Sequence, residues 1–137
     1  MKWRKDEFIV TDERNRIDAQ RTGELLRATS WADERPQDVV ERCIQTSLNF
    51  GMFAGERQVG YARLVSDFVT QAYLSDVVIE EALRGKGLGS WLLECILNHP
   101  DLNTCRIDLV TADAHEFYRK HGFGTHCYDF LVHNPKQ

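Results

Sequence analysis

The sequence lacks the cysteine pattern of a disulfide framework or a zinc site. Its four cysteines, Cys43, Cys95, Cys105 and Cys127, lie far apart and form no C-x-x-C pair. Closely spaced cysteine pairs are typical of structural zinc sites, and dense cysteine patterns are typical of small secreted domains. We therefore expect packed or free thiols in a reducing compartment, a cytoplasmic location and no bound metal.

The sequence also lacks an excess of basic residues and a long apolar run. Lys and Arg number 17 against 21 Asp and Glu, which gives a formal net charge of −4 at pH 7. This balance argues against a broad nucleic-acid-binding face. No apolar run reaches membrane-spanning length, and residues 1–5 lead into no signal-peptide core, so we expect no membrane partner.

Internal repeats, low-complexity segments and linkers are missing too, so we predict one domain over residues 1–137, long enough to bury its own core. β-branched or alternating apolar runs indicate strands, and apolar residues three and four apart indicate helices. Their order predicts an α+β fold, a mixed central sheet flanked by helices with one parallel crossover. Strands are expected at residues 8–11, 50–54, 58–66, 70–79, 106–110 and 125–132, and helices at 18–29, from Pro36 through Ile44, at 88–97 and at 114–120.

A glycine-rich stretch joins the long strand to the next helix. Residues 77–79 are apolar and β-branched, and residues 84–90 read Arg-Gly-Lys-Gly-Leu-Gly-Ser. The first amides of a helix have no internal partner and carry partial positive charge. Glycines remove the Cβ atoms that would keep an anion away from those amides, and Arg84 and Lys86 add formal positive charge. The stretch therefore predicts a diphosphate site at a helix N-terminus.

The spacing of the glycines distinguishes between kinds of diphosphate loop. The Walker pattern is absent, and G-x-G-x-x-G fails from Gly85 and from Gly87. What fits is Arg-x-x-Gly-x-Gly, from Arg84 to Gly89. This resembles the acetyl-coenzyme A loop of the GNAT N-acetyltransferase superfamily. Without the resemblance, the same residues read as a tight turn that closes a helix N-terminus.

A second segment strengthens the resemblance. Residues 111–123, Thr-Ala-Asp-Ala-His-Glu-Phe-Tyr-Arg-Lys-His-Gly-Phe, resemble the A-x-x-x-Tyr-x-Lys-x-Gly-Phe segment of that superfamily. They follow the glycine loop by a strand and a loop, as in the family, and the element order from Phe8 to His133 is similar to the GNAT fold. Thr111 departs from the pattern, because many members carry a coenzyme A-contacting Asn there, and a threonine hydroxyl offers fewer hydrogen-bonding groups.

The resemblance implies acetyl transfer from acetyl-coenzyme A to an amine. It implies that main-chain amides of Val77 and Ile79 hold the pantetheine arm, that an amide near Val77 polarises the acetyl carbonyl, and that Tyr118 protonates the leaving thiolate. On helical spacing alone, Tyr118 reads instead as a core aromatic. The cofactor-binding residues are expected to be Val77, Val78, Ile79, Arg84, Gly85, Lys86, Gly87, Leu88, Gly89, Ser90 and Thr111.

The sequence does not decide which residue is the general base, and it indicates the acceptor pocket only by its position in the chain. Asp76, Glu80, Asp108 and His115 are candidate bases, and a water chain with no dedicated base is an equal alternative. In the family that the chain resembles, the segment between the first two helices flanks the acceptor, which here is residues 30–35. The residues expected near the acceptor are Trp31, Asp33, Glu34 and Asp76.

We predict an N-acetyltransferase that acts on the primary amine of a small molecule, because the chain has no inserted domain that could grip a polypeptide. Two alternatives stay open: a catalytically idle coenzyme A-binding or regulatory domain, and an enzyme that acetylates protein or peptide amines. A nucleotide-binding α/β protein is disfavoured, because no Ser or Thr follows a Gly-Lys pair. The sequence does not decide the oligomeric state, and a homodimer stays open.

Overall fold

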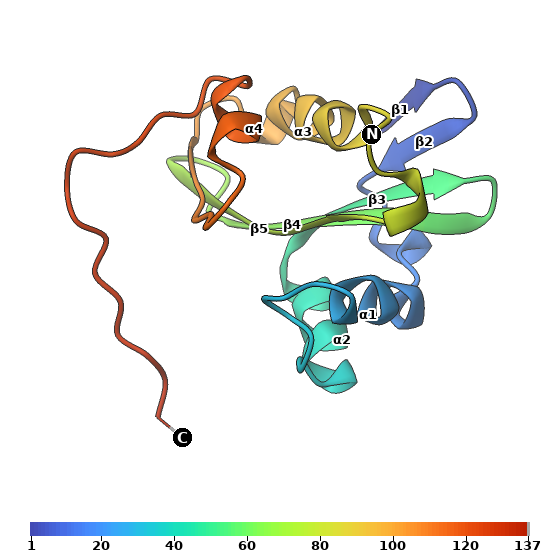
Figure 1. Ribbon diagram of the computed structural model, residues 1–137, viewed down its shortest axis with the longest axis horizontal. Helices are drawn as coiled ribbons and strands as arrows, with labels where there is room; N and C mark the ends of the chain where they lie inside the picture. The colour runs from blue at the N-terminus through green and yellow to red at the C-terminus, as the bar shows by residue number, and fades with distance from the viewer. Residues whose placement is uncertain (137) are drawn as a thin grey trace.

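A six-stranded mixed sheet forms the centre of the computed structural model, which describes residues 1–136 (Figure 1). The strands lie in chain order, antiparallel from β1 to β5, with β6 parallel to β5. The α+β prediction is thereby confirmed. The strands are β1 (Lys2–Lys5), β2 (Phe8–Thr11), β3 (Leu48–Ala54), β4 (Arg57–Ser66), β5 (Gln71–Ile79) and β6 (Arg106–Asp108). The helices are α1 (Ala19–Arg27), α2 (Gln37–Thr46), α3 (Leu88–Leu97) and α4 (His115–Arg119), with short 3₁₀ turns η1 (Arg14–Arg16), η2 (Glu81–Leu83) and η3 (Pro100–Leu102).

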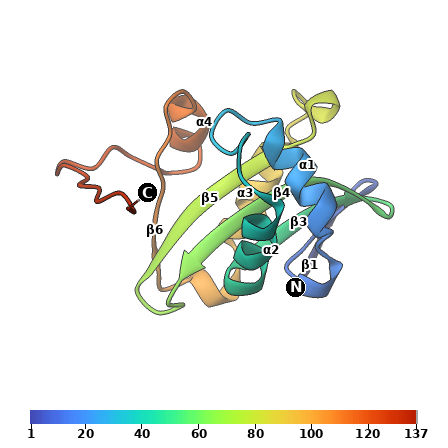
Figure 2. The same cartoon turned by 90° about the horizontal axis from the view of Figure 1, so that it is seen from below.

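Helices cover both faces of the sheet. In Figure 1, α1 and α2 lie below the sheet and α3 and α4 lie above it, and Figure 2 shows α1 and α2 crossing the strands from the lower side. The local sequence explains where α1 starts, since the Asp18 side chain accepts a hydrogen bond from the Arg21 amide and so caps the helix. Pro36 precedes α2 as its N-cap residue, close to the expected position.

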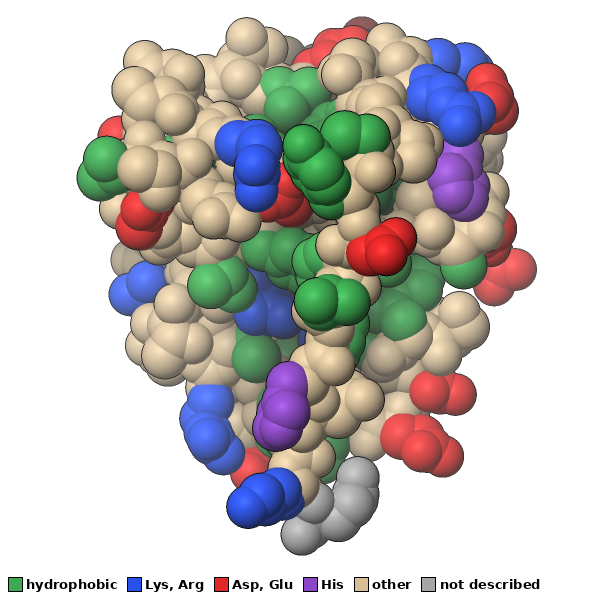
Figure 3. Space-filling view, turned by 90° about the vertical axis from the view of Figure 1, so that its left-hand side faces the viewer, with side chains coloured by type: hydrophobic (Ala, Val, Ile, Leu, Met, Phe, Trp, Pro, Cys, Tyr) green, Lys and Arg blue, Asp and Glu red, His purple; other side chains and the backbone are tan. Residues whose placement is uncertain are grey.

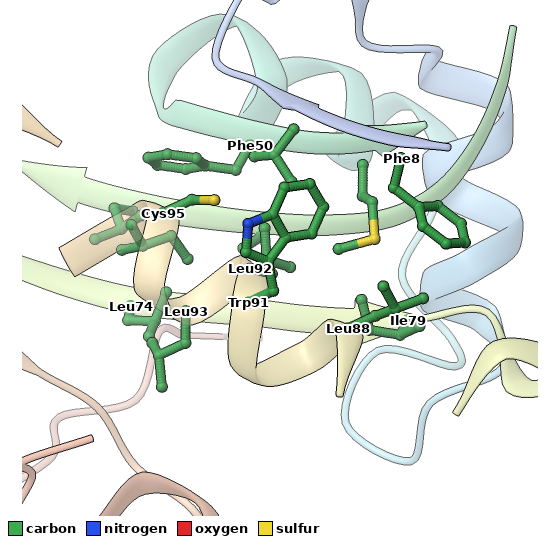
Figure 4. Packing of buried hydrophobic residues seen from close by; sticks show 14 of the residues in the cluster. Phe8, Phe50, Leu74, Ile79, Leu88, Trp91, Leu92, Leu93 and Cys95 are labelled. Carbon is green, nitrogen blue, oxygen red and sulfur yellow. The ribbon is translucent and has the colours of Figure 1, made fainter. Parts of the chain in front are cut away.

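Each face of the sheet buries its own apolar cluster. The cluster under α3 joins the sheet to the helix through residues such as Phe50, Leu74 and Leu92 (Figure 4). The cluster over α1 and α2 contains Leu26 and Val78. Each fully buried side chain of this size contributes about 1.5–3 kcal/mol to folding, so the two layers hold the strands in place.

Strand β1 was not predicted from the sequence. Three of its four residues are charged, and Trp3 alone is partly buried, so no alternating pattern was visible. The strand forms because Trp3 packs on Phe50 with ring centroids 5.9 Å apart. Asp6, at φ 54°, makes the tight turn that pairs β1 with β2.

The prediction of a last strand at residues 125–132 is wrong. No strand lies there among the described residues, and Tyr128 and Phe130 are 77% and 68% exposed. Alternation supplies strand propensity, but a strand also needs a neighbour to pair with, and this segment leaves the body of the molecule (Figure 1). Strand β6 is also shorter than the expected 106–110. Within residues 1–136, no helix is long and apolar enough to span a membrane.

Candidate functional site

Strand β5 carries one extra residue opposite β4. Tyr61 lies opposite Val78, and Arg63 lies opposite Ser75, so one residue of β4 faces residues 76–77 of β5. This is a β-bulge, which bends its strand and interrupts the hydrogen-bond ladder. The bulge occurs a few residues before the glycine-rich loop.

The extra residue reverses the side chains that follow it. Leu74 packs in the cluster under α3, whereas Val78 packs in the cluster over α1 and α2. Residues four apart on a regular strand would share one face. Asp76, inside the bulge, has φ 58°, in the left-handed region that Asp tolerates better than most residues.

The main-chain groups are reversed as well. Before the bulge, the Thr70 carbonyl accepts from the Arg106 amide at the start of β6 at 2.9 Å, so even-numbered residues face β6. After the bulge, the Glu80 amide donates to a β4 carbonyl at 2.8 Å, so odd-numbered residues face away from β4. The amides of Val77 and Ile79 therefore point to the side on which β6 lies.

β6 accompanies β5 only at the beginning of that strand. The parallel pairing covers residues 71–73 of β5, opposite residues 106–108. In the described part of the chain, no strand pairs with that edge of β5 from Leu74 to Ile79. This unpaired edge is a template to which an extended ligand can add as a further strand.

The glycine-rich loop follows the unpaired edge after the short turn η2. Gly85 and Gly87 have φ of 82° and 78°, and a Cβ atom at either position would meet nothing within 4 Å. The first bond of α3 runs from the Trp91 amide to the Gly87 carbonyl at 3.1 Å, so the amides of residues 88–90 have no helical partner. The loop is thus an open, left-handed turn with free amides, as an anion site needs.

The other loop residues differ in their surroundings. Arg84 donates from Nε to the Ile79 carbonyl at 3.2 Å, and Lys86 is exposed. The Ser90 hydroxyl lies 3.2 Å from Nε2 of His121, and a Cβ at Gly89 would lie 3.6 Å from the Phe117 ring. The side chains of Val78 and Leu88 are buried in the core, so both could meet a ligand only through the main chain.

Tyr118 and Thr111 line a cavity of about 610 Å³ next to β6 and α4. The Thr111 hydroxyl accepts from the Ala114 amide at 3.0 Å, and its own proton stays available for a ligand. The Tyr118 ring packs edge-on against Phe117 and Phe123, with centroids 5.0 and 5.7 Å away. Burial raises the pKa of Tyr118, so the phenol stays protonated at neutral pH and can donate its proton.

On the opposite face, a buried carboxylate ties the loop between α1 and α2 to the bulge. Oδ2 of Asp76 accepts from Nη1 of Arg35 at 2.6 Å and from Nε of Arg63 at 2.8 Å. Burial opposes the charged form, but the hydrogen bonds from the two arginines lower the pKa of Asp76 below its usual value. Asp76 is therefore a weak base. Trp31, on the same loop, is 56% exposed, and Asp33 and Glu34 are exposed.

The remaining base candidates lie in different surroundings. Glu80 is paired with Arg57 and, at 2.7 Å, with Arg21, and these partners lower its pKa. Asp108 accepts from Gln71 at 2.8 Å. His115 is exposed at the rim of the Tyr118 cavity. In the part of the chain that the structure describes, no three His, Cys, Asp or Glu side chains are grouped to hold a metal ion.

The bulge, the glycine loop and Tyr118 all fall within one stretch that matches a known family. Residues 48–125 match the model of the acetyltransferase (GNAT) domain. The chain belongs to the GNAT acetyltransferase family. The matched stretch begins at β3 and ends just beyond α4, so it includes every cofactor-binding residue expected from the sequence.

Individual relatives agree with the family. A solved structure described as a "putative acetyltransferase belonging to the GNAT family", from Xanthomonas campestris pv. campestris, is 35% identical, with a TM-score of 0.84 over 91% of this chain and 93% of that one. A Gibberella zeae protein described as a "putative acetyltransferase" is 26% identical over an aligned region that covers 86% of this chain and 79% of that protein. A GNAT family acetyltransferase from Elizabethkingia anophelis, solved with acetyl-CoA bound, is 15% identical with a TM-score of 0.68, over 88% of this chain and 78% of that one, and shows a shared fold alone.

Sequence reasoning missed two arginines of this GNAT domain. Arg35 lies 41 residues from Asp76 along the chain, and Arg63 lies 13 residues from it. Neither spacing is a local pattern, so no signal in the sequence pairs them. The bulge in β5 leaves only a faint signal in the sequence. It interrupts the alternation of apolar and polar residues, but half-buried strands often lack a regular alternation even without a bulge.

The Asp76 carboxylate should stabilise this GNAT domain at neutral pH. Asp76→Asn keeps the tolerance for positive φ but removes the charge that pairs two partly buried arginines. We expect it to lower the free energy of unfolding at pH 7 by about 3 kcal/mol. Because the folded-state pKa is depressed, this contribution is complete above the unfolded pKa near 3.8 and is lost as pH falls through the folded value.

Urea unfolding at pH 7 and near pH 3 tests this expectation, with the exposed Asp113→Asn as the matched control. The difference between Asp76→Asn and wild type should shrink at the lower pH, and the control should change little at either. An equal loss at both pH values would show that the carboxylate charge is not what stabilises the bulge.

Proposed function

We propose that this GNAT family member transfers the acetyl group of acetyl-coenzyme A to the primary amine of a small molecule. The observation that carries the proposal is the unpaired edge of β5, where the amides of Val77 and Ile79 point into the opening and the glycine loop follows one short turn later. The similar fold of the Elizabethkingia protein that binds acetyl-CoA supports the same donor.

Binding of the donor would use main-chain groups at both ends of the loop. The pantetheine arm carries amides, so it can pair with Val77 and Ile79 as an additional strand. The diphosphate would lie over the free amides of residues 88–90, where the helix dipole and the positive charge of Lys86 favour an anion. The Thr111 hydroxyl would donate to the pantetheine arm or to an oxygen of the diphosphate.

Acetyl transfer then needs one nucleophile and one acid. The neutral amine nitrogen attacks the thioester carbonyl carbon, a C–N bond forms, and negative charge develops on the carbonyl oxygen. An amide near Val77 stabilises that oxyanion. When the C–S bond breaks, Tyr118 gives its proton to the thiolate, and the acetylated nitrogen loses its extra proton to water. Water takes that role in preference to Asp76 and Glu80, because arginines hold both carboxylates charged and so make them weak bases; Asp108 and His115 stay alternatives. The Tyr118 phenolate then recovers a proton from water, which closes the cycle.

Turnover of acetyl-coenzyme A across a panel of amines tests the proposal. Release of the free thiol is followed with polyamines, arylalkylamines and peptides with free N-termini. We expect a small amine to be acetylated well above the hydrolysis background. Acetylation of peptides with all small amines inert would favour the peptide alternative, and tight cofactor binding without any turnover would favour the idle domain.

Trp31 is the proposed aromatic wall of the acceptor pocket, because it is exposed on the loop that Arg35 ties to β5. Loss of a cation–π contact of about 0.5–2 kcal/mol should raise the amine KM of Trp31→Ala by roughly 2- to 30-fold. The KM for acetyl-coenzyme A should stay the same. Val69→Ala, a truncation of another exposed apolar residue, is the control. Equal KM values in both variants would remove Trp31 from the acceptor site.

A further inference from the structure

Helix α4 contacts the first turn of α3 at two neighbouring points. A Cβ atom at Gly89 would lie 3.6 Å from the Phe117 ring, and Nε2 of His121 lies 3.2 Å from the Ser90 hydroxyl oxygen. Figure 1 shows the two helices on the same face of the sheet. In the described part of the chain, the second contact is the one hydrogen bond that joins residues 115–123 to another helix or strand. His121 therefore connects α4 to the helix start at which the diphosphate is expected.

The imidazole of His121 is oriented by its own neighbours. Its ring packs against Phe117, with centroids 5.6 Å apart and planes inclined by 56°. Its main-chain amide donates to the Tyr118 carbonyl at 3.0 Å, and the Phe123 amide donates to the same carbonyl at 3.2 Å. The side chain is partly buried, and a hydrogen bond away from bulk water is electrostatically stronger than one in it.

A bound diphosphate would fix the direction of the bond between His121 and Ser90. A serine hydroxyl has one proton to donate and two lone pairs that accept, whereas an imidazole nitrogen can play either part. The phosphate oxygens of a diphosphate carry no proton at neutral pH, so they can only accept. When Ser90 gives its proton to such an oxygen, Nε2 of His121 has to carry a hydrogen and donate it to the Ser90 oxygen.

Single, well-placed donors matter here because little positive charge surrounds the loop. The chain has a formal net charge of −4. Arg119 of α4 is paired with Glu116 at 2.6 Å. Figure 3 looks onto the side on which α4 lies, and among the described residues on that face the Lys and Arg side chains are scattered between acidic ones. Selection of an anion therefore depends on hydrogen-bond donors more than on a broad positive field.

We propose that His121 is a positioning residue that acts through Ser90 and makes the enzyme selective for thioesters that carry a diphosphate. The inference rests on the proposed function, because it assumes that acetyl-coenzyme A binds at the glycine loop. Donation from Nε2 of His121 turns the Ser90 proton away from the imidazole and toward the phosphate oxygen. The hydroxyl then adds a side-chain donor to the free amides of residues 88–90, and a shorter acetyl thioester gains nothing from it.

Two donors of different length test the role of His121. Calorimetry measures the affinity for coenzyme A, and steady-state kinetics compare acetyl-coenzyme A with S-acetylpantetheine, which lacks the diphosphate. His121→Phe keeps a ring against Phe117 but cannot donate, so coenzyme A should bind about 5- to 10-fold more weakly, the equivalent of one hydrogen bond. The kcat/KM for S-acetylpantetheine should not change, whereas a merely structural role would alter both donors alike.

Matched variants separate the hydrogen bond from general effects of substitution. The amide nitrogen of His121→Gln can donate in the same direction and should restore most of the affinity. His133→Phe, the same substitution at an exposed histidine, should bind coenzyme A like wild type. Ser90→Ala should weaken binding to a similar extent, and adding His121→Phe to it should have no further effect. Ser90→Ala also tests the bond from its other end if His121→Phe is poorly folded by circular dichroism.

The role of His121 would be overturned, with the proposed function left standing, by any of three results. These are wild-type affinity in folded His121→Phe, an equal loss toward both donors, and additive losses in the double variant. Failure of His121→Gln to restore affinity would also count against it, because donation would then not be what the imidazole supplies. A wild-type protein that binds no coenzyme A would instead overturn the proposed function, and the role of His121 with it.

Discussion

Gly87→Glu is expected to weaken acetyl-coenzyme A binding by about 100-fold or more, the equivalent of losing two charge-assisted hydrogen bonds. The residue caps α3 at φ 78°, and the space over it is open. A glutamate there would cover the amides of residues 88–90 and set a carboxylate against the diphosphate. Calorimetric titration measures the affinity, and a thermal-shift assay shows whether acetyl-coenzyme A still stabilises the fold.

The control must share the backbone strain of the substitution. Gly55 has φ 61°, a Cβ atom added there would meet nothing within 4 Å, and the residue lies in the hairpin between β3 and β4. Gly55→Glu therefore adds the same charge and a similar strain away from the loop, and it should bind the cofactor like wild type. If folded Gly87→Glu also binds like wild type, the diphosphate does not lie at this helix.

Tyr118→Phe is expected to lower kcat by roughly 100-fold, the usual size of a general-acid contribution. The phenyl ring keeps its contacts with Phe117 and Phe123, so the affinity for acetyl-coenzyme A should change little. Because burial raises the pKa of Tyr118, the loss of wild-type turnover caused by ionisation of its phenol should lie on the alkaline side, above the ordinary phenol value of 10.0. That alkaline limb should disappear in the variant.

Single-turnover measurement ensures that the chemical step, and not product release, is observed. Tyr128→Phe, which removes a hydroxyl from an exposed tyrosine, is the matched control and should keep wild-type kinetics. A Tyr118→Phe enzyme with an unchanged single-turnover rate would make the residue a core aromatic. The thiolate would then have to take its proton from water.

Some parts of this domain could be predicted from the sequence, and others could not. The conformation of the glycine loop was predictable because it depends on neighbouring residues: left-handed turns at Gly85 and Gly87 and the free amides that follow are consequences of local sequence. Strand β1 could not be predicted, because three of its four residues are charged and show no strand pattern. It becomes a strand only through the packing of Trp3 on Phe50. The segment at 125–132 failed in the opposite way, since it has the pattern of a strand and lacks a neighbour in its own chain.

The sequence by itself determined the α+β fold, the family and the position of the glycine loop, because short-range periodicity and glycine spacing decide how a strand passes into a helix. The tertiary structure alone decided which way the groups around that loop point. One extra residue in β5 turns the amides of Val77 and Ile79 toward the opening. Such a bulge is defined by the pairing register of β5 with β4, and a register exists only once the two strands lie side by side. Likewise, Arg35 reaches Asp76 from 41 residues away, a contact that depends on how the helices pack against the sheet.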